Sequence, residues 1–192
     1  YHYNGKRCDS LERVQAIAER IGSIEKVVVV PLLNPAPDVS GMTSAALFQD
    51  YLDSTSTDVD FERLPFDHPL YIMYSSGTTG VPKCIVHGAG GSLLQHLKEH
   101  QLQTDLRRED VFFYFTTCGW MMWNWLVSGL ATGATVVLYD GSPFAEDGRT
   151  LLDAIDREGI SVFGTSAKFI AALEKAGHKP AQSHQLSSLR AI

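Results

Sequence analysis

The sequence predicts an α/β protein in which layered sheets are joined by helical crossovers, and three observations support this fold class. Short runs of β-branched and aromatic residues alternate with amphipathic stretches, as strands and crossover helices do. A glycine-containing loop directly follows an apolar run at residues 70–74, a place where open α/β sheets usually bind ligands. The chain has 192 residues, 44% of them hydrophobic, so it can bury the core of one domain or of a large piece of one.

Residues 1–33 are expected to form a βαβ piece. Asp9 and Glu12 have the spacing of a capping box, and apolar residues follow at helical spacing until Gly22. A continuous β-branched run at 27–30 is typical of a buried strand. The expected elements are a short strand at 1–3, a helix at 9–21 and the buried strand at 27–30.

Residues 34–69 are expected to connect this piece to the rest of the chain. Their composition shifts to Pro, Ser, Thr and Asp, interrupted by a short helical pattern at 43–52. We interpret the acidic stretch at 50–60 as a solvated surface loop, because charge runs usually form such loops.

Residues 70–192 are expected to form an α/β portion that contains the phosphate loop described below. The sequence shows no internal repeat, and strand patterns alternate with helical ones throughout. Strands are predicted at 70–74, 84–87, 111–115, 134–138 and 160–163, with the opening of another at 189–192. Helices are predicted at 92–103, around 123–130, at 151–158 and at 166–175, the last stopped by Gly177.

The loop at residues 74–83, YSSGTTGVPK, is the segment most informative about function. Glycines let backbone N–H groups approach an anion closely and tolerate positive φ, while Ser and Thr hydroxyls add donors. A lysine adds a mobile cation, and successive inward N–H groups form an anion-binding concavity. The loop is therefore predicted to bind nucleotide phosphates through Ser75, Ser76, Gly77, Thr78, Thr79, Gly80 and Lys83.

Two other interpretations of this loop fit its residues less well. A P-loop requires four residues between its glycines and then Gly-Lys-Ser/Thr, whereas two residues separate Gly77 from Gly80 and Lys83 follows Pro82. A flexible Ser/Gly/Thr linker would need neither Pro82-Lys83 nor the apolar stretches on both sides.

Residues 75–83 resemble the phosphate loop of the adenylate-forming superfamily, which includes acyl-CoA synthetases, luciferases and the adenylation domains of peptide synthetases. The stretch at 116–130, TTCGWMMWNWLVSGL, together with 3–6 and 27–33, resembles the members that activate acetoacetate. This resemblance covers nearly the whole chain and implies part of the large N-terminal domain of that fold.

By the same resemblance, the adenine segment, the Tyr-Gly-x-Thr-Glu element, the ribose-binding aspartate and a C-terminal domain with the catalytic lysine would follow Ile192. No catalytic residue is then expected within the chain, and the piece alone is expected to have little or no ligase activity.

The resemblance also implies a reaction, an AMP-forming ligation of an acid to CoA. A carboxylate would attack the α-phosphate of ATP, pyrophosphate would leave with Mg²⁺, and the thiol of CoA would attack the acyl-adenylate. Thr78, Thr79 and Lys83 would steady the β- and γ-phosphates as charge shifts towards pyrophosphate. Acetoacetate is the expected acid, with acetate, propionate and butyrate as alternatives.

The tryptophan-rich stretch after Gly119 suggests an acyl pocket, because the superfamily commonly places an aromatic residue there. Trp120, Met121 and Met122 are the candidates for lining it. The alternative is equally open, since aromatic and Met side chains at helical spacing usually belong to a core. We assign Trp123, Leu126 and Val127 to packing, on one helical face with Leu130.

Two functions of other classes remain as alternatives. His96, Glu99 and His100 match the H-x-x-E-H pattern of inverted zincins, which puts two imidazoles one helical turn apart. Only three positions are specified and the helix is expected to carry them on its polar side, so a zinc peptidase is the weaker hypothesis. A non-catalytic module that binds a nucleotide or a partner is the other.

Composition narrows the partners and the compartment. The net charge of −6 and pI near 5.6 argue against general nucleic-acid binding. Three scattered cysteines without a C-x-x-C pair favour a reducing, cytoplasmic location. The sequence has no signal-peptide pattern. It also has no run of about 18 apolar residues, which would indicate a membrane segment. Small molecules are the expected partners, and the sequence does not predict the oligomeric state.

Overall fold

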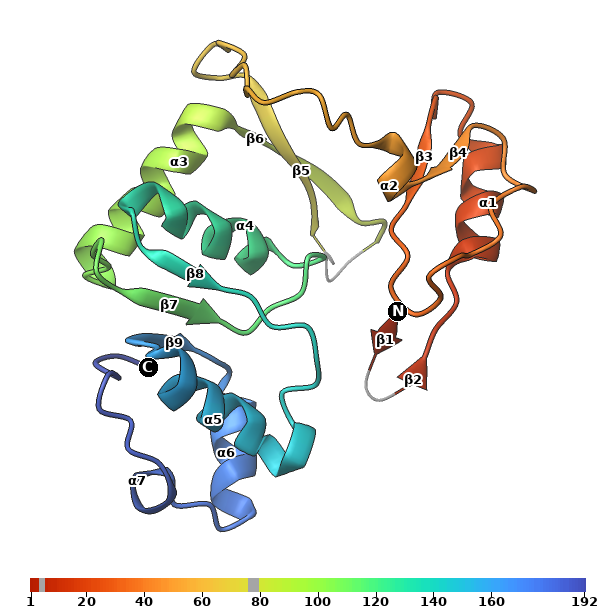
Figure 1. Cartoon of the computed structure of the whole chain (residues 1–192). Helices are drawn as coiled ribbons and strands as arrows, with labels where there is room; N and C mark the ends of the chain where they lie inside the picture. Colours follow the sequence, from red (N-terminus) through yellow and green to blue (C-terminus); the bar gives the residue numbers. More distant parts are fainter. Residues whose placement is uncertain (4–5, 76–79) are drawn as a thin grey trace. The chain divides into compact units, whose positions relative to one another are not determined.

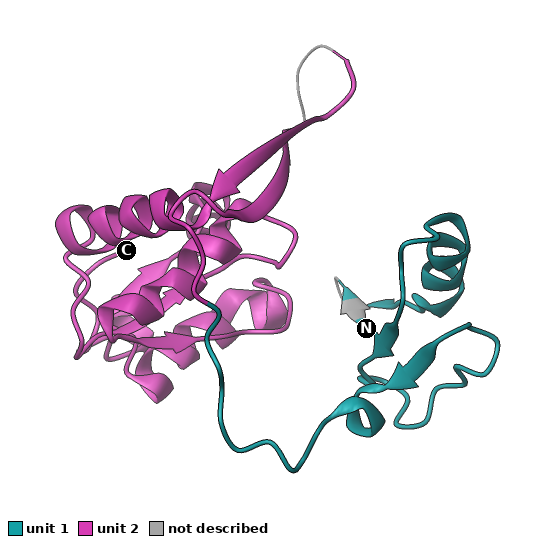
Figure 2. Ribbon diagram, turned by 90° about the horizontal axis from the view of Figure 1, so that it is seen from above, with its two compact units in different colours: residues 1–62 teal, residues 63–192 magenta. Residues whose placement is uncertain are grey.

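The computed structural model describes residues 1–3, 6–75 and 80–192. The chain divides into two compact units, Tyr1–Glu62 and Arg63–Ile192 (Figure 2). The boundary lies inside the segment that was expected to be a connection, residues 34–69. Each unit is described by itself.

The described residues of unit 1 form two small sheets and two helices (Figure 1). Strand β3 pairs in parallel with β4, joining Val28 to Ala46, and a parallel pair requires a long connection rather than a tight turn. The elements are β1 (His2–Tyr3) antiparallel to β2 (Lys6–Arg7), α1 (Leu11–Arg20), β3 (Val27–Val29), β4 (Ala45–Leu47) and α2 (Phe48–Tyr51).

Three expectations for unit 1 are wrong in detail. Helix α1 begins after Ser10, and Asp9 accepts a hydrogen bond from the Leu11 N–H (2.9 Å) instead of forming a capping box with Glu12. Strand β3 is half-buried rather than buried, because its sheet has two strands in the described structure. The helical pattern at 43–52 is realised only in its second half, since Ala45–Leu47 pairs with β3.

Unit 2 confirms the predicted alternation of strands and helices. It begins with an antiparallel hairpin and continues with three parallel strands separated by helices. The elements are β5 (Pro69–Ser75), β6 (Lys83–Gly88), α3 (Ala89–Lys98), a π-helical turn (Glu99–Gln103), β7 (Val111–Tyr114), α4 (Met121–Ser128), a 3₁₀ turn (Gly129–Thr132), β8 (Thr135–Val137), a 3₁₀ turn (Ala145–Gly148), α5 (Arg149–Glu158), β9 (Val162–Gly164), α6 (Ala167–Lys175) and α7 (Pro180–Ser183).

The parallel sheet has the strand order β8-β7-β9 and is covered on both faces. Successive side chains of a strand point to opposite faces, so Phe112 and Phe113 enter different cores. Phe112 packs with Leu126 of α4, and Phe113 packs with Ile155 of α5. The α/β fold class with helical crossovers is thus confirmed.

The helix ends in unit 2 follow from a few residues. Gly177, predicted to stop a helix, follows α6 with φ of 75°. Leu126 is buried and Trp123 is partly buried against the same core, as expected. Val127 and Leu130 were placed on that face wrongly, because they are 37% and 59% exposed. For Leu130, the change from α4 to a 3₁₀ turn at Gly129 breaks the helical spacing.

Within the described ranges, no helix has both the length and the apolar character that a membrane crossing needs.

Candidate functional site

The predicted phosphate loop joins the two strands of the β5–β6 hairpin. Ser75 at the end of β5 pairs with Lys83 at the start of β6, so these two predicted site residues form the base of the loop. Ser75 is half-buried and Lys83 is exposed. Ser76, Gly77, Thr78 and Thr79 lie outside the described residues.

Gly80 has a backbone conformation that explains why glycine stands there. Its φ is 112°, in the range that residues with a side chain rarely adopt. A Cβ added at Gly80 would have no described atom within 4 Å. The requirement for glycine therefore comes from the backbone angle and not from crowding.

Tyr74 and Cys84 form the next pair inward from the loop. The pKa of the Tyr74 phenol is raised by its hydrogen bond with the Cys84 thiol and by the charge that the thiol can carry.

The structure differs from the sequence argument on why a ligand loop should lie here. The loop does follow β5, but β5 pairs antiparallel with β6, so the rule for open parallel sheets does not apply to it. That rule applies to β7, whose carboxyl end leads through Thr116 and Cys118 into α4.

Helix α4 connects this parallel sheet to the hairpin. Asn124 of α4 donates a hydrogen bond from its side-chain amide to the sulfur of Met73 in β5 (3.4 Å). Met73 lies two residues before Ser75, and Asn124 lies two residues after Met122. The contact therefore brings the phosphate-loop base and the start of α4 into one region of unit 2 (Figure 1).

The acyl-pocket candidates occupy the beginning of α4. Trp120 precedes the first helical residue with an extended backbone, which turns the chain from β7 into the helix. The side chains of Trp120 and Met121 are 70% and 48% exposed, whereas Met122 is half-buried. A tryptophan with this exposure contributes little to a core, which favours the pocket interpretation over packing for Trp120.

The sequence suggested that the H-x-x-E-H residues share one polar face, but the structure does not place them in that way. His100 is fully buried, with ring centroids of Trp125 and Phe112 at 4.3 and 5.6 Å. Its Nε2 lies 2.9 Å from the Trp125 carbonyl oxygen and must donate to it, because a carbonyl can only accept. Burial lowers the pKa of His100 and so favours the neutral form of the ring.

This packing role of His100 was missed because its partners lie 25 and 28 residues away, at Trp125 and Ser128. Desolvation also lowers the pKa of His96, which is half-buried. The part of the chain that the structure describes contains no group of three His, Cys, Asp or Glu residues placed to hold a metal ion.

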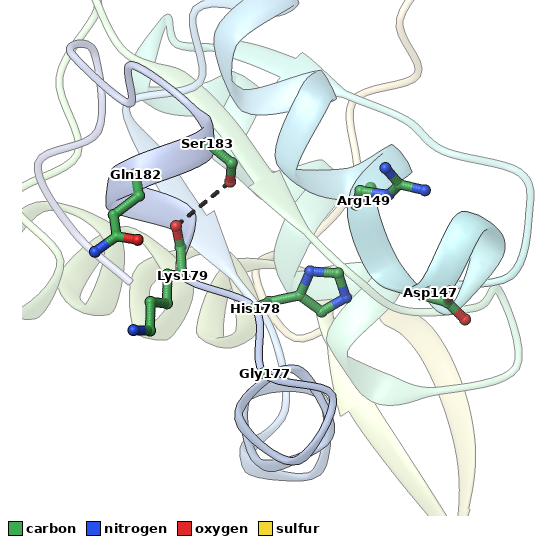
Figure 3. A pocket seen from close by; sticks show the side chains of 7 residues that line it. All are labelled: Asp147, Arg149, Gly177, His178, Lys179, Gln182 and Ser183. Carbon is green, nitrogen blue, oxygen red and sulfur yellow. Dashed lines mark hydrogen bonds between the residues drawn. The ribbon is translucent and has the colours of Figure 1, made fainter.

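A separate open hollow of about 400 Å³ lies beside the beginning of α5 and the connection between α6 and α7. Figure 3 shows the side chains of Lys179 and Arg149 on opposite sides of His178, with the Ser183 hydroxyl donating to the Lys179 carbonyl oxygen. The hollow contains none of the site residues that were predicted from sequence. Its lining is Asp147, Arg149, Gly177, His178, Lys179, Gln182 and Ser183.

Comparison with known proteins gives consistent matches. The family described as AMP-binding enzyme matches residues 4–192. The chain is 56% identical over 194 residues to acetoacetyl-coenzyme A synthetase of Rhizobium meliloti (strain 1021), covering 99% of this chain and 29% of that protein. It is 41% identical over 213 residues to malonamoyl-CoA synthetase vrtB of Penicillium aethiopicum, with coverage of 99% and 29%.

A solved structure is also similar. Acetoacetyl-CoA synthetase from Streptomyces lividans superposes with a TM-score of 0.87 and 42% identity, covering 99% of this chain and 29% of that one. The chain thus spans about 29% of the length of the relatives it matches.

Proposed function

The chain belongs to the AMP-binding enzyme family, and from this premise we propose that it is part of an AMP-forming ligase that joins acetoacetate to CoA. The acetoacetate carboxylate attacks the α-phosphorus of ATP, and the bond to pyrophosphate breaks. The CoA thiol then attacks the acyl carbon, loses its proton and displaces AMP. Mg²⁺ enters with ATP as the counter-ion of its phosphates.

The observation that carries this proposal is the contact between the two predicted halves of the site. The hydrogen bond from Asn124 to Met73 places the start of α4 against the hairpin whose loop is predicted to bind phosphate. In-line adenylation needs the acid next to the phosphates, because positioning supplies much of the rate of such transfers. In this proposal Lys83 faces the phosphates and Trp120 faces the acid.

The named relatives point to the chemical class of the acid. Acetoacetate and malonamate share a carboxylate, a methylene and a carbonyl, and they differ only in the group on that carbonyl, a methyl against an amino group. A pocket that hydrogen-bonds the shared carbonyl would reject butyrate, which lacks it, more strongly than size alone allows. Malonamate is therefore the second candidate substrate, ahead of acetate, propionate and butyrate.

The same proposal places the protein in a reducing compartment, the cytoplasm, with small molecules as its partners. Cys8, Cys84 and Cys118 are free thiols, and the latter two are exposed. Exposed free thiols are typical of proteins that work where disulfides are kept reduced.

Pyrophosphate release by the full-length protein tests the proposal. Acetoacetate, malonamate, acetate, propionate and butyrate are compared at equal ATP and CoA, and acetoacetate should give the highest kcat/KM. A clear preference for acetate, propionate or butyrate would contradict the substrate assignment.

A lysine pair tests the phosphate site in the same assay. Lys83→Ala should raise the KM for ATP and lower kcat, because a cation beside the leaving pyrophosphate is lost. Lys98→Ala removes an exposed lysine at the end of α3 and should leave both constants unchanged. If Lys83→Ala and Lys98→Ala have the same KM for ATP and the same kcat, Lys83 is not part of the site. Replacing Thr78, Thr79 and Lys83 together by alanine extends the test to the whole loop.

A further inference from the structure

The end of helix α4 is held by a histidine from another helix. His100 lies in the π-helical turn Glu99–Gln103, which continues α3. Its Nε2 lies 2.9 Å from the Trp125 carbonyl oxygen and 3.0 Å from the Ser128 hydroxyl. The Ser128 hydroxyl also donates to that carbonyl oxygen (2.7 Å). Two side-chain donors therefore converge on one carbonyl near the end of α4.

This carbonyl depends on side chains because the helix changes its pitch there. In a regular α-helix the Gly129 N–H would donate to the Trp125 carbonyl, four residues back. It donates to the Leu126 carbonyl instead, where the 3₁₀ turn begins. A carbonyl in a protein interior that lacks a donor is destabilising. The donors of His100 and Ser128 thus replace a backbone hydrogen bond that the helix lacks.

The His100 ring also packs against the same end of α4. It contacts the rings of Trp125 and Phe112, and these two lie edge to face with 5.3 Å between their centroids. A Cβ added at Gly129 would lie 2.9 Å from the Phe112 ring, so α4 ends directly on β7. The other ring nitrogen of His100, Nδ1, has no hydrogen-bond partner among the described residues. Within that part of the chain, the ring makes its hydrogen bonds to α4.

The beginning of the same helix carries the acyl-pocket candidates. Met121 and Met122 precede Trp125 by four and three residues, so they lie on its side of the helix, one turn nearer the start. Asn124 lies about 100° around the helix from Trp125 and bonds to Met73 of the hairpin. Helix α4 is therefore fixed at two points of its circumference, by the hairpin at one and by His100 at the other.

A small rotation of α4 would be enough to disturb a pocket. The ends of its side chains lie about 5–6 Å from the helix axis, so a rotation of about 10° moves them by about 1 Å. A displacement of about 1 Å in a group that positions a substrate can slow a reaction by up to about 100-fold. The contact that fixes the rotation of α4 therefore bears on how the pocket holds its substrate.

We propose that His100 is a positioning residue for the acid substrate. By holding the Trp125 carbonyl, it fixes the rotation of α4 about its axis and with it the places of Met121 and Met122. The inference rests on the proposed function, because it needs these methionines to line the pocket for the acid. His100 is fully buried and does not touch the acid, so its effect passes through the helix.

The test compares three variants of the full-length protein. His100→Phe keeps an aromatic ring but cannot donate a hydrogen bond, whereas His100→Gln keeps an N–H donor. Ile155→Val is the matched control, because Ile155 is buried in the core on the other face of the sheet, under α5. Three quantities are measured: the KM values for acetoacetate and ATP from pyrophosphate release, the Tm, and hydrogen exchange at the amides of α4.

His100→Phe should raise the KM for acetoacetate about tenfold and the KM for ATP by less than about twofold. The amides of α4 should exchange faster in this variant than in the wild type, because the end of the helix is no longer held. His100→Gln should keep both KM values within about twofold of the wild type. Ile155→Val should lower the Tm and leave both KM values unchanged.

Several results would overturn the proposal. Faster exchange in His100→Phe with an unchanged KM for acetoacetate would make the contact purely structural. An equal rise in both KM values would show that the acid is not what His100 positions. Unchanged exchange at α4 would show that the contact does not hold the helix. A His100→Gln variant as impaired as His100→Phe would show that the donor is not the cause.

The experiment remains decisive if His100→Phe does not fold. His100→Met then takes its place in the same comparison, because an unbranched methionine adapts to irregular space and has no N–H donor. The two hypotheses also fail separately. If the wild-type protein releases no pyrophosphate with any acid, the proposed function fails, while the exchange experiment still reports on α4. If the wild type is active and His100→Phe behaves like Ile155→Val, only the positioning inference fails.

Discussion

Replacement of Gly80 by alanine separates backbone geometry from contact at the phosphate loop. Gly80 has φ of 112°, and the added methyl group would meet no described atom within 4 Å. Holding a residue with a side chain in such a conformation costs about 1–3 kcal/mol. If ATP binding requires this conformation, the same free energy is lost from binding, which corresponds to a roughly 5- to 150-fold weaker apparent affinity at about 1.4 kcal/mol per tenfold.

The expected result is a KM for ATP that rises by about one to two orders of magnitude. The Tm should change little, because Gly80 is exposed and belongs to neither strand of the hairpin. Pyrophosphate release as a function of ATP concentration, with differential scanning fluorimetry on the same sample, measures both quantities.

Gly159→Ala is the matched control for this experiment. Gly159 has φ of 66° after the end of α5, and a Cβ there would likewise have no described atom within 4 Å. The left-handed penalty of about 1–2 kcal/mol should lower the Tm by several degrees and leave the KM for ATP unchanged. If Gly80→Ala instead lowers the Tm like Gly159→Ala and leaves the KM unaltered, the link between the Gly80 conformation and phosphate binding is refuted.

Three further predictions concern the core, a buried histidine and the acyl pocket. Leu151→Ala should reduce the free energy of unfolding by about 2–5 kcal/mol in urea titrations, because Leu151 is fully buried. The control is Leu102→Ala, at a site that is 77% exposed, and it should change the free energy of unfolding by less than about 0.5 kcal/mol. The pKa of His100 is lowered below 6.5 in the folded state, so the unfolded state binds the proton more tightly and the stability of the fold should fall as pH drops through 6.5. The variant His100→Gln does not titrate and should weaken this pH dependence of stability. An identical pH profile for the variant and the wild type would contradict the argument. Trp120→Ala should raise the KM for acetoacetate about tenfold with little change in the KM for ATP, and the reverse pattern would place Trp120 outside the acid pocket.

Sequence periodicity predicted unit 2 well because its signals are local. The run at 111–115 and the helical pattern at 151–158 became β7 and α5 almost unchanged. The apolar residues of β7 and α5 are buried in the two cores, since both faces of the parallel sheet are covered. Even the opposite orientations of Phe112 and Phe113 follow from the strand period alone.

Prediction was poorer where a distant partner decided the local structure. Ala45–Leu47 has a helical pattern but became β4 because Val27–Val29 offers it a parallel partner. Propensity is a weak guide under such tertiary pairing. The candidate site shows the same division, since Ser75 and Lys83 could be named from the motif whereas the contact of Asn124 with Met73 could not.

The ion pair of Asp110 and Arg190 explains why such partners escape sequence reasoning. An aspartate before a strand and an arginine in a short Ser-Leu-Arg segment are both ordinary surface residues by composition. Only the fold brings them together, and burial then makes the interaction consequential, because a charge that loses its partner in the interior remains desolvated. Residues of this kind are therefore found by asking which buried charges are fully paired and what backbone the pair holds in place. In this chain, such a pair joins the residue before β7 to the segment that bridges to β9 at Ala191.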